Sequence, residues 1–257
     1  MIINPSFSLA NKVAIVTGAS RWTTGKVIAL ELAKAGADVV VAARTAEGIE
    51  EAVAEIRGLG RRSLAVQTDV RITEQVDNMV RRALEEFHQV DILVNNVGAS
   101  FIAPALDLTE GGWDAMVREN LKPAFMCSKA VVSSMIEQGG GSIINIASGE
   151  GLRAVPTNPA YGAAKAGVVN LTMTLAVEWA PYRFRVNAVA PCFIDTPILP
   201  QALAGFPDLQ ETFNRVPLKR AGRLEEIAAP VVFLASDAAG YITGALITVD
   251  GGLTCRM

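Results

Sequence analysis

The 257-residue sequence has few of the residues that build metal centres and disulfide frameworks. It contains one histidine, His88, and three scattered cysteines, Cys127, Cys192 and Cys255, which form no CxxC pair. A single histidine excludes multi-histidine metal clusters and most catalytic triads, so we expect no metal site. Scattered cysteines are typical of a reducing compartment, and we therefore expect a cytoplasmic protein.

Long apolar runs and an excess of positive charge are also missing. No apolar run approaches the roughly 20 residues that span a bilayer, and the first residues, MIINPSFSLANK, do not have the pattern of a signal peptide. The formal net charge of −3 gives no basic footprint for nucleic acid. We therefore expect neither a membrane nor a nucleic acid as a partner. A content of 51% hydrophobic and 19% charged residues suits a sizeable globular core.

Short β-branched apolar runs alternate with helical patterns along the chain. Strands are predicted at residues 12–17, 38–42, 63–67, 91–95, 142–146, 184–189 and 245–249. Helices are predicted at residues 26–35, 47–59, 73–87, 113–138, 161–179 and 224–235. This alternation predicts right-handed βαβ units and a parallel sheet covered on both faces. We therefore predict an α/β fold: one Rossmann-type, doubly wound domain over residues 1–257, with about seven strands.

The stretch from Ser142 to Lys165, SIINIASGEGLRAVPTNPAYGAAK, combines several residues that suit one chemistry. Ser148 follows a predicted buried strand, and Tyr161 and Lys165 stand four residues apart in a helix-favouring run. Residues i and i+4 share a helix face, so the ammonium group would lower the pKa of the phenol. Ser148 could hold a substrate oxygen while Tyr161 moves the proton. The stretch predicts a site that interconverts a carbonyl and an alcohol, although a Tyr–Lys pair at this spacing also arises by chance.

A glycine-containing turn, TGASRWTTGK, follows the first predicted strand, where a doubly wound sheet binds its ligands. Gly18 permits a tight turn, and Gly25 opens a helix whose N-terminus suits a pyrophosphate. The hydroxyl residues between them that could contact phosphate are Ser20, Thr23 and Thr24. The spacing differs from G-x-G-x-x-G, so the turn alone is also compatible with two glycines needed only for backbone geometry.

The second predicted strand ends without the acidic residue that usually binds the ribose 2′-hydroxyl of NAD. Arg44 stands there instead, and Arg21 lies in the glycine-containing turn. Planar guanidinium groups bind phosphate oxygens in pairs, so the two arginines favour NADP(H) over NAD(H). Two exposed surface arginines are the simpler alternative.

From about Leu9 to Gly252 the chain resembles the short-chain dehydrogenase/reductase family, in particular its 3-oxoacyl carrier-protein reductase branch. The matching motifs follow one another in the family's order. They are Thr17-Gly18, Asp69-Val70, Asn95-Asn96-Val97-Gly98, Asn120, Ser148, Tyr161-x-x-x-Lys165, Pro191 to Thr196, and Asp250-Gly251-Gly252.

The resemblance implies a role for each matching residue. Tyr161 would be the general acid/base, and Lys165 would lower its pKa and bind the nicotinamide ribose. Ser148 would orient the substrate oxygen, and Asn120 would anchor a water that connects Lys165 to solvent. The implied cofactor contacts are Asp69 and Val70 around the adenine, Asn96 and Gly98 in the cleft, and Ile194 and Thr196 at the nicotinamide carboxamide.

The sequence departs from the family's motifs in two places: the glycine-containing turn, which in the family reads TGxxxGxG, and the residue after Pro191. Trp22, Thr23 and Thr24 precede Gly25, so the middle glycine is missing and the turn is one residue longer. We expect the Trp22 indole to swing outward, leaving room for the pyrophosphate. Cys192 replaces the glycine that usually follows the proline, and we interpret it as a packing residue because nothing nearby obviously lowers its pKa.

Residues 195–216 fall where the family carries a mobile substrate lid, and prolines at 197, 200 and 207 exclude one long helix there. Phe101, Val155 and Phe193 predict a partly apolar pocket for a small-molecule carbonyl or alcohol substrate. Glu150 and Arg153 either bind polar groups in it or face solvent. The candidate substrates are a 3-oxoacyl thioester, a steroid or terpenoid ketone, and a sugar-derived ketone. Apolar surface on helix 113–138 and on the last strand, together with the resemblance, implies a homotetramer.

Three functions therefore remain open. The first is an NADP(H)-dependent carbonyl reductase or alcohol dehydrogenase. The second is a 3-oxoacyl carrier-protein reductase of fatty-acid synthesis, for which Lys219, Arg220 and Arg223 hint at a basic docking patch. The third is a non-catalytic dinucleotide-binding sensor or scaffold, which the irregular turn suggests and the joint presence of Asn120, Ser148, Tyr161 and Lys165 opposes.

Overall fold

A seven-stranded parallel sheet forms the centre of the computed structural model, which describes residues 5–20 and 23–255. Its strand order is β3-β2-β1-β4-β5-β6-β7, which confirms the predicted doubly wound Rossmann-type fold. The strands are β1 (Val13–Thr17), β2 (Asp38–Ala43), β3 (Ser63–Gln67), β4 (Ile92–Asn95), β5 (Gly141–Ile146), β6 (Phe184–Pro191) and β7 (Leu246–Val249).

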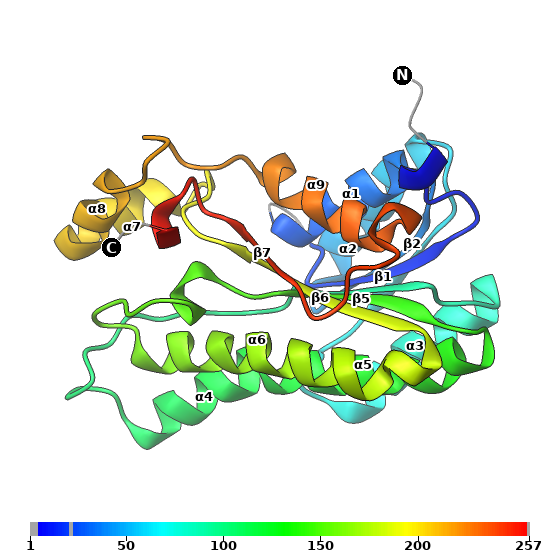
Figure 1. The fold of residues 1–257 in the computed structure, drawn as a ribbon, viewed down its shortest axis with the longest axis horizontal. Coiled ribbons are helices and arrows are strands. Elements are labelled where there is room, and N and C mark those ends of the chain that lie inside the picture. The colour runs from blue at the N-terminus through cyan, green and yellow to red at the C-terminus, as the bar shows by residue number, and fades with distance from the viewer. Residues whose placement is uncertain (1–4, 21–22, 256–257) are drawn as a thin grey trace.

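Helices cover both faces of the sheet (Figure 1). One face carries α1 (Thr24–Lys34), α2 (Ala46–Gly58) and α9 (Leu224–Ala235). The other carries α3 (Thr73–Phe87), α4 (Glu110–Asn120), α5 (Lys122–Glu137) and α6 (Pro159–Trp179). Each helical layer buries a separate apolar cluster against the sheet. The strands are therefore covered on both faces, which explains why they are continuous apolar runs rather than alternating ones.

The strand order reverses between β1 and β4, where β1 pairs in parallel with β2 on one side and with β4 on the other. Val16 of β1 lies beside Val41 of β2 and Val94 of β4. The Thr17 hydroxyl donates to the Val94 carbonyl at 3.2 Å and accepts from the Asn96 N–H at 3.1 Å. A crevice opens at the carboxyl ends of the strands at such a reversal, and this is where doubly wound sheets bind ligands.

The single helix predicted at residues 113–138 is wrong, because the chain forms α4 and α5, which meet at Leu121. Pro123 has no N–H to donate to the helical hydrogen-bond ladder. In a continuous helix its ring would also clash with the carbonyl of the residue four positions earlier. The side chain of Asn120 ends α4 by donating to the carbonyls of Met116 (3.0 Å) and Ala99 (2.8 Å). The break therefore ties Asn120 to the segment that follows β4.

Two further local features concern His88 and the prolines of residues 195–216. His88 is exposed and ends α3 in the left-handed conformation, with φ 65°. The prolines divide residues 195–216 into two short helices, α7 (Leu199–Gly205) and α8 (Pro207–Asn214), which lie together at one end of the sheet (Figure 1). In the described ranges, no helix has both the length and the apolar character that crossing a bilayer requires.

Candidate active site

Among the cavities that the described residues form, two meet at the carboxyl edge of the sheet. The larger, about 700 Å³, lies at the ends of β1, β2 and β3, and the smaller, about 410 Å³, lies between β5, α6, the β6 end and α7. Both fall in the size range of small-molecule and cofactor sites. They form one continuous groove, because six residues line both: Thr24, Asn96, Gly98, Ala99, Thr196 and Ile198.

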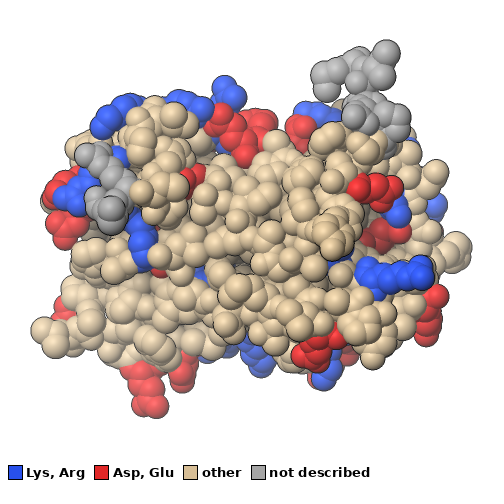
Figure 2. Space-filling model, viewed as in Figure 1, with Lys and Arg blue, Asp and Glu red and all other residues tan. Residues whose placement is uncertain are grey.

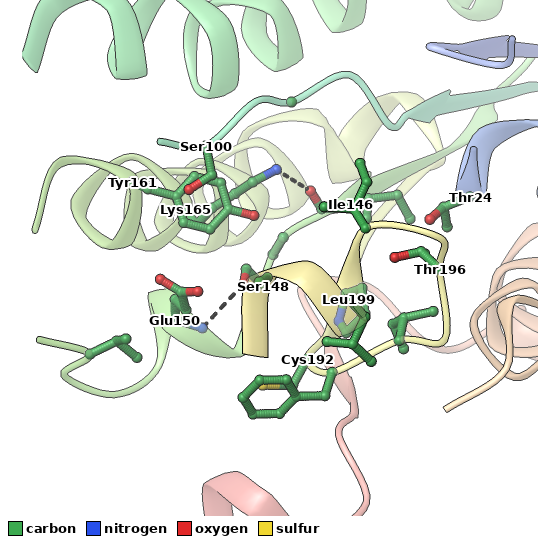
Figure 3. A pocket seen from close by; sticks show the side chains of 18 of the residues that line it. Thr24, Ser100, Ile146, Ser148, Glu150, Tyr161, Lys165, Cys192, Thr196 and Leu199 are labelled. Atoms are coloured by element: carbon green, nitrogen blue, oxygen red, sulfur yellow. Dashed lines mark hydrogen bonds between the residues drawn. The ribbon is translucent and has the colours of Figure 1, made fainter. Parts of the chain in front are cut away.

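Ser148, Tyr161 and Lys165 all line the smaller cavity (Figure 3). β5 ends at Ile146 and delivers Ser148, whose hydroxyl accepts from the Glu150 N–H at 3.2 Å and starts a short 3₁₀ turn at Gly149–Gly151. This turn packs directly on α6: a Cβ on Gly151 would lie 2.7 Å from the Lys165 carbonyl carbon. The close approach of turn and helix brings the serine to the helix that carries the tyrosine.

Burial dominates the electrostatics of this group. Burial raises the pKa of Tyr161 to about 12, an effect larger than the opposing influence of the Ser148 side chain. Burial also lowers the pKa of Lys165 to about 8. The Lys165 ammonium donates to the Ile146 carbonyl at 2.9 Å and lies 5.8 Å from the centre of the Tyr161 ring. In this structure the ammonium group is directed to a backbone carbonyl and burial sets the Tyr161 pKa, so the lowering of that pKa by Lys165 stays a prediction.

Asn120 and Lys165 meet on either side of Gly98. A Cβ on Gly98 would lie 2.8 Å from Asn120 Oδ1 and 3.1 Å from Lys165 Nζ. Asn120 is 2% exposed, and its Oδ1 accepts from the Ala99 N–H at 3.2 Å. Because Gly98 has no side chain, Asn120 and Lys165 can both approach the backbone of the segment that follows β4.

The glycine-containing turn leaves space where a dinucleotide would approach the backbone. Gly18 has φ 66°, which favours glycine, and a Cβ on Gly25 would lie 2.6 Å from the Gly18 carbonyl oxygen and 2.5 Å from Asn96 Nδ2. Thr23 is the N-cap of α1: its hydroxyl donates to the carbonyls of Gly18 and Ser20 and accepts from the Lys26 N–H. The Thr23 hydroxyl is thus engaged within the turn, although Ser20, Thr23 and Thr24 all line the larger cavity. Arg21 and Trp22 lie outside the described residues, so their predicted positions are not tested.

Replacing Gly25 with alanine is expected to destabilise the protein by about 3 kcal/mol, because the new methyl group overlaps backbone that cannot move independently. The affinity for dinucleotide is expected to fall with it, since the turn has to open. Urea unfolding and cofactor titration measure the two effects. Gly58→Ala is the matched control, because a Cβ there meets no atom within 4 Å. Equal stability of the two variants would contradict the close packing of β1 on α1.

The outer end of the larger cavity contains a charge cluster that was not found in the sequence analysis. Arg71 donates to Asp69 through Nε at 2.8 Å and to Glu119 through Nη1 at 2.8 Å. This pairing lowers the pKa of the Asp69 carboxyl group. The Arg44 side chain lines the same cavity and is exposed. Arg71 directly follows the Asp69-Val70 motif, so its position was a usable signal, whereas Glu119 is distant in sequence.

The substrate side of the groove is partly apolar, as predicted. Val155 and Phe193 line the smaller cavity, as do Ile198, Leu199, Ala202 and Leu209 of α7, α8 and the preceding loop, whereas Phe101 does not. Burial raises the pKa of Cys192 to about 11, and the thiol packs beside Gly149, which supports its interpretation as a packing residue. Ile194 lies at the cavity wall and forms an isolated bridge with Gly222.

The described residues fit a nicotinamide dinucleotide. A narrow backbone crevice at Gly18 and Gly25, an elongated groove, and a Tyr–Lys–Ser group at its inner end are the features that such a ligand requires. The groups present can donate and accept protons at a substrate oxygen. Within the described part of the chain, no three His, Cys, Asp or Glu side chains are grouped to hold a metal ion.

Comparisons with known proteins agree with this arrangement. A family model described as enoyl-(acyl carrier protein) reductase matches residues 18–254. A 3-oxoacyl-[acyl-carrier-protein] reductase from Synechocystis sp. is 42% identical over 248 residues, covering 96% of this chain and 98% of the relative.

Two solved structures are similar over nearly their whole lengths. A putative short-chain alcohol dehydrogenase from Sinorhizobium meliloti has a TM-score of 0.93 and 41% identity, covering 98% of this chain and 100% of that one. A gluconate 5-dehydrogenase from Burkholderia cenocepacia, in complex with NADP and tartrate, has a TM-score of 0.92 and 33% identity, covering 98% of this chain and 99% of that one.

Proposed function

The chain belongs to the short-chain dehydrogenase/reductase family, and from that premise we propose that it interconverts a ketone and a secondary alcohol with NADP(H). As a member of this family it is an oxidoreductase that acts on CH–OH groups. The observation that carries the proposal is that Ser148, Tyr161 and Lys165 line a cavity continuous with one that suits a dinucleotide. A non-catalytic dinucleotide-binding sensor would not require these three side chains to lie together beside the cofactor cavity.

In the proposed mechanism, Tyr161 is the general acid/base. Its raised pKa keeps the phenol protonated near neutral pH, which suits it to protonate the oxygen of a ketone as that oxygen gains negative charge. Ser148 donates a hydrogen bond to the same oxygen and fixes its position. When bound, the nicotinamide cofactor supplies a hydride to the carbonyl carbon or accepts one from the alcohol carbon.

In the proposed mechanism, Lys165 and Asn120 support Tyr161 and Ser148 without contacting the substrate oxygen. We assign Lys165 to the nicotinamide ribose hydroxyls, and its positive charge stabilises the phenolate that forms when Tyr161 gives up its proton. Asn120 anchors a water that links Lys165 to solvent. The proximity of both side chains to Gly98, which lines both cavities, supports this assignment.

The remaining cofactor contacts follow the groove outward. Thr196 and Ile194 are assigned to the nicotinamide carboxamide, Asn96 and Gly98 to the middle of the cleft, and Asp69 with Val70 to the adenine. The pyrophosphate is assigned to the turn between Gly18 and Gly25, with Ser20, Thr23 and Thr24. Because the Thr23 hydroxyl donates to backbone carbonyls, Thr23 would contribute its backbone N–H.

Arg44, with Arg21, is assigned to the 2′-phosphate of NADP. Arg44→Ala is expected to raise the dissociation constant of NADPH by about 10- to 100-fold, the range for a lost charge-assisted contact, and to change that of NADH by less than about twofold. Titration with each reduced cofactor, followed by nicotinamide fluorescence, measures both constants. Arg82→Ala is the control, because Arg82 is exposed on α3. A wild-type protein that binds NADH more tightly than NADPH would refute the assignment.

The reductase of 3-oxoacyl carrier-protein thioesters remains the second candidate because of the Synechocystis relative. Glu226 offsets part of the expected docking patch: it pairs with Arg220 at 2.7 Å and with Arg223 at 3.3 Å, and these arginines lower the Glu226 pKa to about 2. Lys219 donates instead to the Asn214 carbonyl at 2.8 Å, so the patch keeps positive charge and the second candidate stays open.

We also propose a cytoplasmic homotetramer in which α7 and α8 form a lid over the substrate. Large apolar side chains stay exposed on α4, α5 and α6, namely Trp113, Phe125, Met173 and Val177. Figure 2 shows few charged side chains in the middle of the face over β7. Such surfaces support association with further copies of the chain.

A further inference from the structure

Arg153 is a charged residue of the substrate cavity to which the proposed mechanism gives no role. It lies on the loop between the 3₁₀ turn of Ser148 and α6, and it lines the same cavity as Ser148 and Tyr161. Its Nε atom is buried, and no hydrogen-bond partner for it exists among the residues that the structure describes. A buried guanidinium donor without an acceptor costs free energy, so a site of this kind is completed by an acceptor from a ligand.

No charged neighbour of Arg153 accepts a hydrogen bond from its Nε atom within the described residues. Glu150 is near enough for the arginine to lower its pKa, yet burial raises that pKa by more. One Glu150 oxygen accepts instead from Asn158 Nδ2 at 2.8 Å. Within the described chain, Arg153 is in none of the salt bridges. The Cys192 thiol is the other titratable neighbour, and burial raises its pKa to about 11, so it carries no charge near neutral pH.

We propose that Arg153 binds a carboxylate of the substrate, so that the enzyme acts on small keto and hydroxy carboxylic acids. The inference rests on the proposed oxidoreductase function and names its substrate class. A guanidinium group presents parallel N–H donors that match the two oxygens of a carboxylate. The apolar side chains of Val155, Phe193 and Leu199 surround the carbon skeleton, and Arg153 sets which end of it faces Tyr161.

The alternatives place no negative charge inside this cavity. A steroid or terpenoid ketone would leave the buried Nε atom without an acceptor, and the acyl chain of a carrier-protein thioester has no anionic group beside its reacting carbonyl. A carboxylate supplies both the acceptor and the opposite charge.

The test compares acids with their carboxamides, which have nearly the same shape without the charge. The acids are 4-oxopentanoate and 4-oxocyclohexanecarboxylate, and each is compared with its own carboxamide. The value of kcat/KM for each ketone is measured from the oxidation of NADPH. Wild type is expected to prefer the acid by about 100-fold, the range for a buried charge pair. Arg153→Gln is expected to reduce this preference to within a few-fold of unity, and Arg153→Lys to restore part of it. Arg82→Gln, at an exposed position, is expected to retain the preference.

A second measurement requires no turnover. The dissociation constants of cyclohexanecarboxylate and its carboxamide are measured in the presence of saturating NADP⁺. Acid-selective binding that disappears in Arg153→Gln supports the carboxylate site, even where ketone reduction fails and the proposed function falls. Turnover of ketones without acid preference, or a preference that survives Arg153→Gln, overturns the carboxylate site and leaves the proposed function standing. NADPH binding by each variant verifies that it is folded.

Discussion

Tyr161→Phe is expected to lower kcat by about a thousandfold while NADPH affinity changes by less than about twofold. The substitution removes one hydroxyl group and retains the ring that forms part of the cavity wall. Without that hydroxyl, the substrate oxygen loses its proposed proton donor, and hydride transfer would have to produce an alkoxide held only by the Ser148 hydroxyl. Steady-state kinetics with a substrate identified by ketone screening, together with fluorescence titration of NADPH, separate the two effects.

The matched control is Tyr182→Phe, which removes the same hydroxyl group from an exposed tyrosine far along the chain. Its kcat is expected to stay within about twofold of wild type, as for surface substitutions generally. Undiminished turnover in Tyr161→Phe would remove the tyrosine from its proposed role. Loss of NADPH binding in the same variant would instead show that the phenol maintains the shape of the groove.

Most of the fold was predictable from the sequence because a doubly wound parallel sheet leaves a strong periodic signal. β3, α3 and α9 have the predicted bounds. The two-helix arrangement of residues 110–137 was missed, because apolar periodicity continues across Leu121 and conceals the effect of Pro123. Apolar periodicity shows which residues are buried on a helix. It stays the same when the chain changes direction between two consecutive apolar helices, so it does not reveal the break.

The positions of the candidate site residues were also predictable, but their electrostatics were not. Sequence spacing placed Tyr161 and Lys165 on one helix face, and both line the cavity. Spacing contains no information on which acceptor the ammonium group meets, and here it meets the Ile146 carbonyl. The same limit applies to Arg153, because spacing does not record that its Nε atom is buried without a hydrogen-bond partner among the described residues.

Lys165→Met is expected to lower kcat/KM by about 100- to 1000-fold, because the phenolate of Tyr161 loses the positive charge that lies 5.8 Å from the centre of its ring. Methionine has a similar length and fills the buried space, so the fold is expected to be retained. Lys129→Met is the control, since Lys129 is exposed on α5. Steady-state kinetics of the two variants give the comparison, and an activity loss shared by both would point to a general effect of removing charge.

The same variant tests the burial of Lys165 through the pH dependence of stability. Its pKa is about 8 in the folded protein and about 10.5 when the chain is unfolded. Between these values the unfolded state binds more protons than the folded state, so the contribution of Lys165 to stability rises with pH. Below pH 8 both states are protonated, and the full cost of burying the charge remains. Wild type is therefore expected to gain about 2 kcal/mol relative to Lys165→Met between pH 7 and pH 10.

Urea unfolding of wild type and Lys165→Met at the two pH values measures this gain. Taking the difference between the proteins cancels the titration of groups that both retain, provided that those groups do not interact with Lys165. A difference that stays constant with pH would mean that the ammonium group is solvated in the folded protein. Burying a lysine costs stability, and a loss of activity in Lys165→Met would link that cost to the chemistry proposed at Tyr161.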